Sequence, residues 1–423
     1  MKKQIIIACM LCVKLQTIFS QGDIPFKHID LEFKEYIDLV KTHNLKYASE
    51  KLNINISEAA IEAAKVFNDP YFSIDLTPES QENMKKEYVV SSELVKTIDF
   101  GGQRKARIDL TKSEKELTVA LVADYFRNLL AEATLFYIEA MKHQQLFMVR
   151  YNSYQTMKKL SEADSIRYNL GSIMEIDAIQ SKLEAGILRN ELIHASSEWK
   201  NSLLDVSLMT GTSKNDTLYL PSDHLQNVSR EFVLNNLITE AQNNRADLQA
   251  ALLNKEVAQK VLRLTKKGRN TDIDLKIGLS NSYLIGGGSP SSPGMTAGIA
   301  LPLKFSNLYR GDLKMAELKI QQADQLFEYA DLQIKNEITQ AWEYYMDYCR
   351  QVDNFNNGLL ENAENVRKGK IYSYQRGETS LLEVLNAQRT YNDIQTRYYE
   401  TRYYQAAALI ELEKAAGIWD IDF

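Results

Sequence analysis

Apolar side chains recur every three or four residues through two long parts of the chain, and that spacing places them on one face of a helix. In the first part, the steps of four and three residues run through Val122, Phe126, Leu129, Ala133, Phe136 and Ala140. All seven prolines lie outside residues 79–220 and 303–423, and proline interrupts helices. We therefore predict long helices over residues 103–210 and 309–417.

These predicted helices are too long for the interior of an ordinary globular domain. A helix over residues 104–168 would be on the order of 95 Å long at about 1.5 Å per residue. We expect a coiled-coil rod or the wall of an extended structure, with an ordinary helical bundle as the simpler alternative.

Two shorter parts of the chain, residues 70–98 and 271–304, follow the pattern of β-hairpins. Each contains two short segments with β-branched and aromatic residues. The connections at 78–83 and 286–293 are polar or rich in Gly, Ser and Pro, which favours loops. We therefore predict four strands, two in each hairpin.

The order of these elements repeats along the chain. The hairpins align at an offset of 203 residues, and Gly171 aligns with Gly377 at an offset of 206. Each copy reads helix, helix, hairpin, long helix, glycine turn, long helix. We predict two structural repeats, residues 21–220 and 221–423, in which the two glycines mark the places where long helices reverse.

The first 20 residues have the layout of a secretory signal peptide: a basic start, a short apolar run and a small residue before a polar one. The apolar run is too short to span a bilayer, and we do not expect lipidation at Cys9. Beyond this segment Cys349 is the only cysteine, so no disulfide can form within the exported chain.

The charge balance argues against a nucleic-acid partner. The chain carries 50 Lys and Arg against 56 Asp and Glu, net −6, and no long basic cluster stands out. The five histidines show no metal-ligand spacing, and no catalytic constellation is present, so we expect neither an enzyme nor a cofactor or metal site.

The number of predicted strands bears on whether one chain could form a closed β-barrel. Four strands cannot form a barrel, and open strand edges are not tolerated in lipid. If these strands enter a membrane, several chains must therefore contribute to one barrel. Alternatively, each hairpin caps a soluble coiled coil.

The organisation of the whole exported chain resembles the TolC-type outer-membrane efflux proteins. The segments that carry the resemblance are the two glycine turns with the helix starts that follow them, residues 167–177 and 374–389, and the C-terminal segment 412–417. Within that family, residues 99–108 and 302–311 are similar to the heavy-metal efflux, CzcC-like, branch, although Lys304 and Tyr309 depart from its usual residues.

The resemblance implies a fold that is mainly α with a small β part. Three chains would complete a twelve-stranded barrel in the bacterial outer membrane, continued by a helical tunnel through the periplasm. The implied function is the passive outer-membrane channel of a tripartite efflux system, with metal cations or drugs as substrates. Its implied partners are a periplasmic adaptor (membrane fusion) protein, an inner-membrane pump of the RND type and outer-membrane lipid.

The resemblance also assigns roles to particular residues. Glu383 and Asn386 match tunnel-facing positions where some members place acidic rings, and three copies of Glu383 would favour cations; the simpler interpretation is a solvated helix charge. Asp177 and Tyr374 match gate contacts between neighbouring helices, with Thr379 in place of the usual arginine partner. A surface Asp and a packed Tyr are the alternative.

The turns at Gly171 and Gly377 are the implied docking tips for the adaptor. Two other functions stay open at this point. One is the outer-membrane duct of a type I protein secretion system, and the other is a periplasmic coiled-coil scaffold without a pore.

Overall fold

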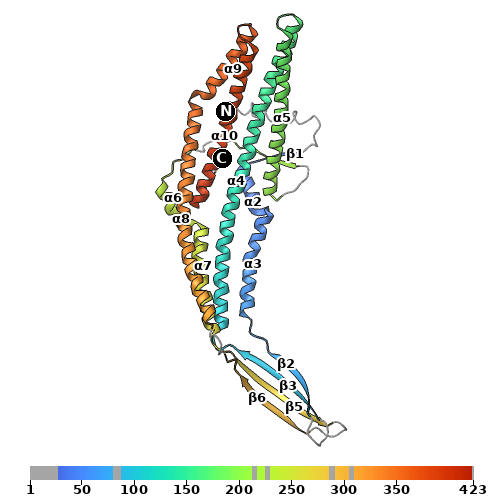
Figure 1. Ribbon diagram of the computed structural model, residues 1–423, viewed down its shortest axis with the longest axis vertical. Coiled ribbons are helices and arrows are strands. Elements are labelled where there is room, and N and C mark those ends of the chain that lie inside the picture. The colour runs from blue at the N-terminus through green and yellow to red at the C-terminus, as the bar shows by residue number, and fades with distance from the viewer. Residues whose placement is uncertain are drawn as a thin grey trace. The chain divides into compact units, whose positions relative to one another are not determined.

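A computed structural model describes residues 27–79, 87–211, 217–223, 229–284, 291–303 and 309–421 (Figure 1). The expected signal peptide at residues 1–20 with Cys9, most of both predicted hairpin loops, and Lys304 lie outside these residues. The predicted fold class, mainly α with a small β part, is confirmed. Within the described residues, no helix combines the length and low charge that a bilayer crossing requires.

The chain forms two compact units. Unit 1 takes its described residues from 1–49, 125–244 and 334–423, and unit 2 from 50–124 and 245–333. Each predicted repeat contributes segments to both units.

Unit 2 contains one antiparallel sheet with the strand order β2-β3-β5-β6 (Figure 1). Its strands are β2 (Tyr71–Glu79), β3 (Glu87–Ile98), β5 (Ile273–Leu284) and β6 (Ser291–Ala300). Parts of three longer helices, α3 (Leu45–Lys65), α4 (Gln103–Asn169) and α8 (Arg310–Asn354), belong to this unit together with the whole of α7 (Ala246–Gly268). The two predicted hairpins thus lie side by side, joined by twelve residue pairs from Glu87↔Leu284 to Ile98↔Ile273.

The two faces of this sheet differ in polarity. Because successive side chains of a strand point to opposite faces, the pairing register assigns each residue to a face. One face carries mostly large apolar residues: Phe72, Ile74, Leu76, Tyr88, Val90, Leu94, Leu275, Ile277, Leu279, Tyr283, Met295 and Ile299. The other carries mostly polar residues and glycine: Ser73, Asp75, Thr77, Ser91, Glu93, Thr97, Asp274, Lys276, Gly278, Ser280, Gly294, Thr296 and Gly298.

Unit 1 is built from helices around a mostly apolar core that includes the buried side chains of Tyr36, Tyr137, Trp199 and Leu409. Besides its parts of α3, α4 and α8, it contains α2 (Phe33–His43), α5 (Glu175–Met209), α6 (Leu234–Asn244), α9 (Leu360–Gln375) and α10 (Leu381–Ala416). The sequence did not predict its two strands, β1 (Lys27–Leu31) and β4 (Thr217–Pro221), which pair in parallel.

The predicted long helix that starts near residue 309 is interrupted once before its glycine turn. A single π-helical turn, η1 (Phe355–Leu359), separates α8 from α9. Inside it, Gly358 has φ +97° and Asn357 has ψ 34°, so neither is helical. Glycine adopts positive φ without steric cost, which is why the interruption falls at this residue.

Candidate functional site: the two helix turns of unit 1

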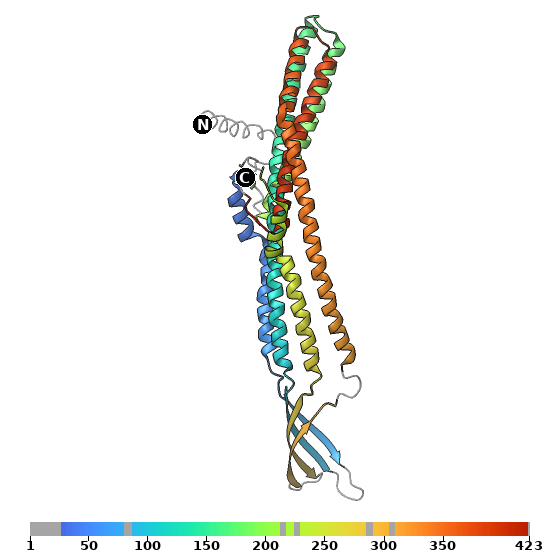
Figure 2. The same cartoon turned by 90° about the vertical axis from the view of Figure 1, so that its left-hand side faces the viewer.

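Unit 1 contains two helical hairpins, α4 with α5 and α9 with α10, whose turns lie close together in both views (Figures 1 and 2). Gly171 and Gly377 follow the ends of α4 and α9 with φ +72° and +78°. The expected geometry, a glycine just past a helix end with positive φ, is therefore confirmed at both turns.

The two turns are closed by the same pair of backbone hydrogen bonds. In the first, Gly171 N donates to Tyr168 O (2.8 Å) and Ser172 N donates to Arg167 O (2.8 Å). In the second, Gly377 N donates to Tyr374 O (3.0 Å) and Glu378 N to Ser373 O (2.9 Å). This is the Schellman arrangement, which satisfies the last carbonyl groups of a helix.

Both return helices begin with an acid at their third residue, Asp177 in α5 and Glu383 in α10. Carboxylates are favourable there because the N-terminus of a helix carries partial positive charge. Neither helix start has a side-chain cap from the preceding residue.

Tyr374 bonds to a residue that the sequence analysis did not name. Its ring is buried, and its hydroxyl donates to Asp164 Oδ1 at 3.1 Å. The Arg167 guanidinium lies 4.9 Å from the ring centre and 3.6 Å from Asp164 Oδ1. The expected gate residue Asp177 is half-buried and close enough to act on both groups by charge, but the hydrogen-bond acceptor in this chain is Asp164.

Burial governs the ionisation of this group of residues. Desolvation raises the pKa of Tyr374 to about 12, and the neighbouring Asp164 carboxylate adds to the rise. Desolvation also raises the pKa of Asp164, although the Tyr374 hydroxyl and the Arg167 charge oppose the rise. At neutral pH Tyr374 is therefore the proton donor of the pair.

An apolar cluster below the turns joins the two hairpins. Its buried side chains come from all four helices: Met157, Leu160, Leu188, Tyr374, Leu381, Val384 and Leu385. Further along, Arg389 donates two hydrogen bonds to Glu184, at 3.2 and 2.9 Å, and Ser153 donates to Asn392 at 2.6 Å. Within one chain, the two hairpins are thus fixed to each other by apolar and polar contacts.

Glu383 is exposed and is engaged by two partners. Lys370 of α9 forms an ion pair with it, and the Thr379 hydroxyl donates to its Oε2 at 3.0 Å. The hydrogen bond from Lys370 is the main reason that the pKa of Glu383 is lowered, so its carboxylate stays ionised at neutral pH. Asn386, one turn further along α10, is also exposed. The structure places both on an exposed side of α10.

Sequence reasoning missed Asp164 and Lys370, yet a signal was present. Each lies seven residues before its tip glycine, so the two occupy equivalent positions of the predicted repeats. Seven residues are about two helical turns, which returns the side chain to the same helix face. Extending the repeat alignment from the glycines back into α4 and α9 would have paired them.

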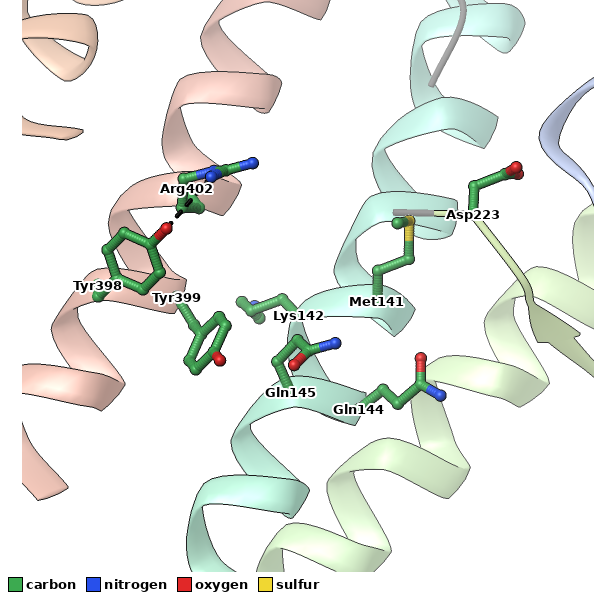
Figure 3. Close-up of a pocket in the computed structure, with 8 residues that line it drawn as sticks. All are labelled: Met141, Lys142, Gln144, Gln145, Asp223, Tyr398, Tyr399 and Arg402. Atoms are coloured by element: carbon green, nitrogen blue, oxygen red, sulfur yellow. Dashed lines mark hydrogen bonds between the residues drawn. The ribbon is translucent and has the colours of Figure 1, made fainter. Parts of the chain in front are cut away.

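A small cavity of about 160 Å³ lies between α4 and α10 (Figure 3). Its lining includes Lys142, Gln144 and Gln145 of α4 and Tyr399 of α10. Lys142 is already held by Glu139 at 3.0 Å and by the Tyr403 ring at 4.3 Å. Among the described residues, no group of His, Cys, Asp and Glu side chains is arranged to hold a metal ion.

The tips also carry exposed apolar side chains beside their turns. Leu170, Met174 and Ile176 of the first hairpin are 74%, 68% and 62% exposed, and Tyr372 and Leu382 of the second are 58% and 59% exposed. Side chains of this kind are typical of a surface that another protein covers.

Comparison with known proteins shows which proteins this chain resembles. Residues 237–418 match the outer membrane efflux protein family. The cobalt-zinc-cadmium resistance protein CzcC of Cupriavidus metallidurans is 19% identical over 391 residues, 90% of this chain and 89% of that protein.

Two solved structures show the same fold. CusC, described as forming a transmembrane channel, has a TM-score of 0.74 and 16% identity over 95% of this chain and 96% of its own. The CmeC outer membrane channel of Campylobacter jejuni has a TM-score of 0.73 and 14% identity over 91% of this chain and 85% of its own. The second half of this chain therefore matches the outer membrane efflux protein family, and the whole chain has the fold of these channel structures.

Proposed function

We propose that the protein is the outer-membrane channel of a tripartite efflux system. The observation that carries the proposal is the sheet of unit 2, in which one face is apolar and largely exposed while the other is polar. Phe72, Ile74 and Met295 are 63%, 66% and 74% exposed on the apolar face. Lipid acyl chains would cover that face, and the polar face would line an aqueous pore.

The edges of the sheet support an assembly of several chains. Among the residues that the structure describes, strands β2 and β6 each have a partner on one side only. An unpaired strand edge cannot remain in a bilayer, so both edges need strands from neighbouring copies. Three copies would give the twelve strands that the family resemblance implies.

The tips supply the contacts expected of the periplasmic end of such a channel. We assign adaptor docking to the turns at Gly171 and Gly377 with their exposed apolar neighbours. We assign gating to Tyr374 and Asp177, and add Asp164 to this set because it accepts the hydrogen bond from Tyr374. Glu383 and Asn386 form the proposed entrance ring. An inner-membrane pump of the RND type would deliver substrate to this ring.

Metal cations are the first substrate class to test. The relative CzcC, which covers most of the chain, is a cobalt-zinc-cadmium resistance protein. Deleting the gene should raise sensitivity to Co²⁺, Zn²⁺ or Cd²⁺, and a plasmid copy should restore resistance. Sensitivity to organic drugs instead would move the substrate to that class and leave the channel assignment intact.

The channel itself is tested by its physical state. Membranes washed with carbonate should retain the protein, and native mass spectrometry in detergent should give three subunits. A protein that washes off and stays monomeric in detergent-free buffer would contradict the proposal and favour a periplasmic scaffold.

A further inference from the structure

Basic residues gather in unit 2 where its helices meet the sheet. The end of α3, the start of α4 and the end of α7 each lie within about six residues of a strand along the chain, and the start of α8 follows β6 by ten residues. Their exposed cations, which we call the basic surface, are Lys65, Lys105, Arg107, Lys266, Arg269 and Arg310. The chain as a whole is acidic, with net charge −6, so its overall composition does not explain this local cluster of basic residues.

Helix stability alone does not account for the cations at the start of α4. Its first turn contains Arg104, Lys105 and Arg107 and no acid. Cations are unfavourable there because the helix N-terminus already carries partial positive charge. Arg104 and Arg107 bond to the last carbonyl groups of α3, through Lys65 O at 2.7 Å and Ala64 O at 3.3 Å. Lys105 has no such contact.

Within the basic surface, Lys65 is paired with Glu62 at 2.6 Å, whereas the acids nearest the start of α4 are engaged by other groups. Asp99 caps α4, accepting from Gln103 N at 3.1 Å and Arg104 N at 2.6 Å, and Asp272 accepts from Gln103 Nε2 at 3.2 Å. In the part of the chain that the structure describes, no salt bridge joins Lys105, Lys266 or Arg269 to an acid. These three cations are therefore available to a ligand.

Exposed apolar side chains lie in the short segments between these helix ends and the strands. Phe67 follows α3 and Phe100 follows β3, and they are 65% and 67% exposed. The Arg104 guanidinium lies 4.0 Å from the centre of the Phe67 ring. Exposed aromatic rings beside cations, next to an apolar sheet face, are the composition of a protein surface at the boundary of a bilayer.

We propose that the basic surface binds the headgroups of anionic phospholipids, with phosphatidylglycerol as the reference ligand. The phosphates lie against Lys105, Lys266 and Arg269, Phe67 and Phe100 lie at the depth of the ester groups, and the acyl chains cover the apolar sheet face. This inference rests on the proposed membrane location of the sheet and adds to it a preference for lipid charge. Each cation near an anionic surface is worth roughly a fivefold change in affinity.

The test uses the detergent-solubilised oligomer and native mass spectrometry with phosphatidylglycerol or phosphatidylethanolamine of equal chain length. Phosphatidylglycerol should bind at least tenfold more tightly at low salt, with the preference weakening as NaCl is raised. The triple variant K105Q/K266Q/R269Q should lose most of that preference. The matched control K158Q/K182Q/K319Q removes three exposed lysines elsewhere and should keep it.

The outcomes separate this inference from the proposed function. Equal binding of both lipids by the natural protein, or equal loss in the two triple variants, would overturn the inference while leaving a membrane-embedded channel in place. Failure to insert into vesicles of either lipid would overturn the proposed function itself. A salt-sensitive preference lost only in the first variant supports the inference.

Discussion

At the scale of single residues, equivalent positions of the two repeats carry opposite charge. Seven residues before each tip glycine stands Asp164 in the first repeat and Lys370 in the second. Asp164 is buried and accepts from Tyr374, whereas Lys370 is partly exposed and pairs with Glu383. The same position of the two predicted repeats therefore differs in chemistry: one hairpin has an internal hydrogen bond there and the other has a surface ion pair.

The Tyr374 hydroxyl should contribute more to stability than a typical single hydrogen bond does. Tyr374→Phe removes this hydrogen bond from the buried Asp164 carboxylate and leaves it Arg167 and Ser181, which should cost about 1.5–3 kcal/mol of the local opening free energy of α9. Hydrogen exchange of the α9 amides measures that energy, and single-channel recording measures the accompanying leak. Tyr372→Phe is the control, because Tyr372 is exposed and bonds only to Arg376 on its own helix turn. Equal effects of the two changes would contradict this role of the Tyr374 hydroxyl.

Lys370 should control how strongly Glu383 selects cations. Lys370 neutralises Glu383 within the chain, so Lys370→Gln should raise cation selectivity. Glu383→Gln should lower cation selectivity by less than the loss of an unpaired acid would. Asn386→Asp should also raise it by adding a second acid one turn along α10. Reversal potentials in asymmetric KCl measure all three. Unchanged potentials throughout would mean that this side of α10 faces away from the lumen.

Glu413 should make the C-terminal segment sensitive to pH. Its side chain is fully buried, Arg230 Nη1 lies 3.0 Å away and the Asp420 amide donates to it at 3.3 Å. Burial raises its pKa from 4.5 to about 8. The native state therefore holds a proton that the unfolded state releases, so local stability is highest below pH 4.5 and declines as pH rises towards 8.

Hydrogen exchange at Asp420, corrected for intrinsic rates, should show this loss of protection, with the opening constant rising by up to tenfold per pH unit. Glu413→Gln should flatten the profile because the amide cannot ionise. A profile with the same slope in both proteins would assign the pH dependence to another group.

At the scale of elements, the turns show how backbone conformation decides which residue a position accepts. Gly171 has positive φ and open space around it, whereas Gly186 lies inside α5, also in open space. Gly171→Ala should therefore cost about 1–2 kcal/mol, because an L-residue is strained in the left-handed region. Gly186→Ala should gain about 0.5–1 kcal/mol as a helix former.

Hydrogen exchange of the α4–α5 hairpin measures both the stability loss expected for Gly171→Ala and the gain expected for Gly186→Ala. Since neither change removes a side-chain contact, an effect of the same sign at both positions would contradict the turn geometry.

The pattern of the sequence predicted the elements that depend on local signals. The heptad-like spacing predicted α4, the short segments rich in β-branched and aromatic residues predicted β2, β3, β5 and β6, and the glycines predicted the turns. It did not predict β1 and β4, because these strands are only five residues long and pair across 190 positions. Nor did it identify Asp164, because a polar residue on a long helix is ordinarily solvent-exposed and only the fold reveals its burial.

At the scale of the whole molecule, the segregated faces of the sheet predict what a new charge will do. Ile277→Lys places a cation on the apolar face, which should cost about 2–4 kcal/mol per chain if lipid covers it. Ser91→Lys places the same cation on the polar face, next to Asp75, and should be tolerated. The amount of heat-stable oligomer in outer-membrane fractions measures the difference. Equal yields of the two variants would argue that lipid does not cover the apolar face.

The π-helical turn η1 also changes how this protein can be recombined with its relatives. A π-turn adds one residue to the helical repeat, and one residue corresponds to a rotation of about 100° around the axis. The face that α9 presents is therefore out of phase with the one that α8 presents. A chimera that exchanges the second hairpin should transfer residues 355–359 together with that hairpin. Joining α8 directly to a foreign α9 without them would turn the proposed docking and gating side chains away from their partners.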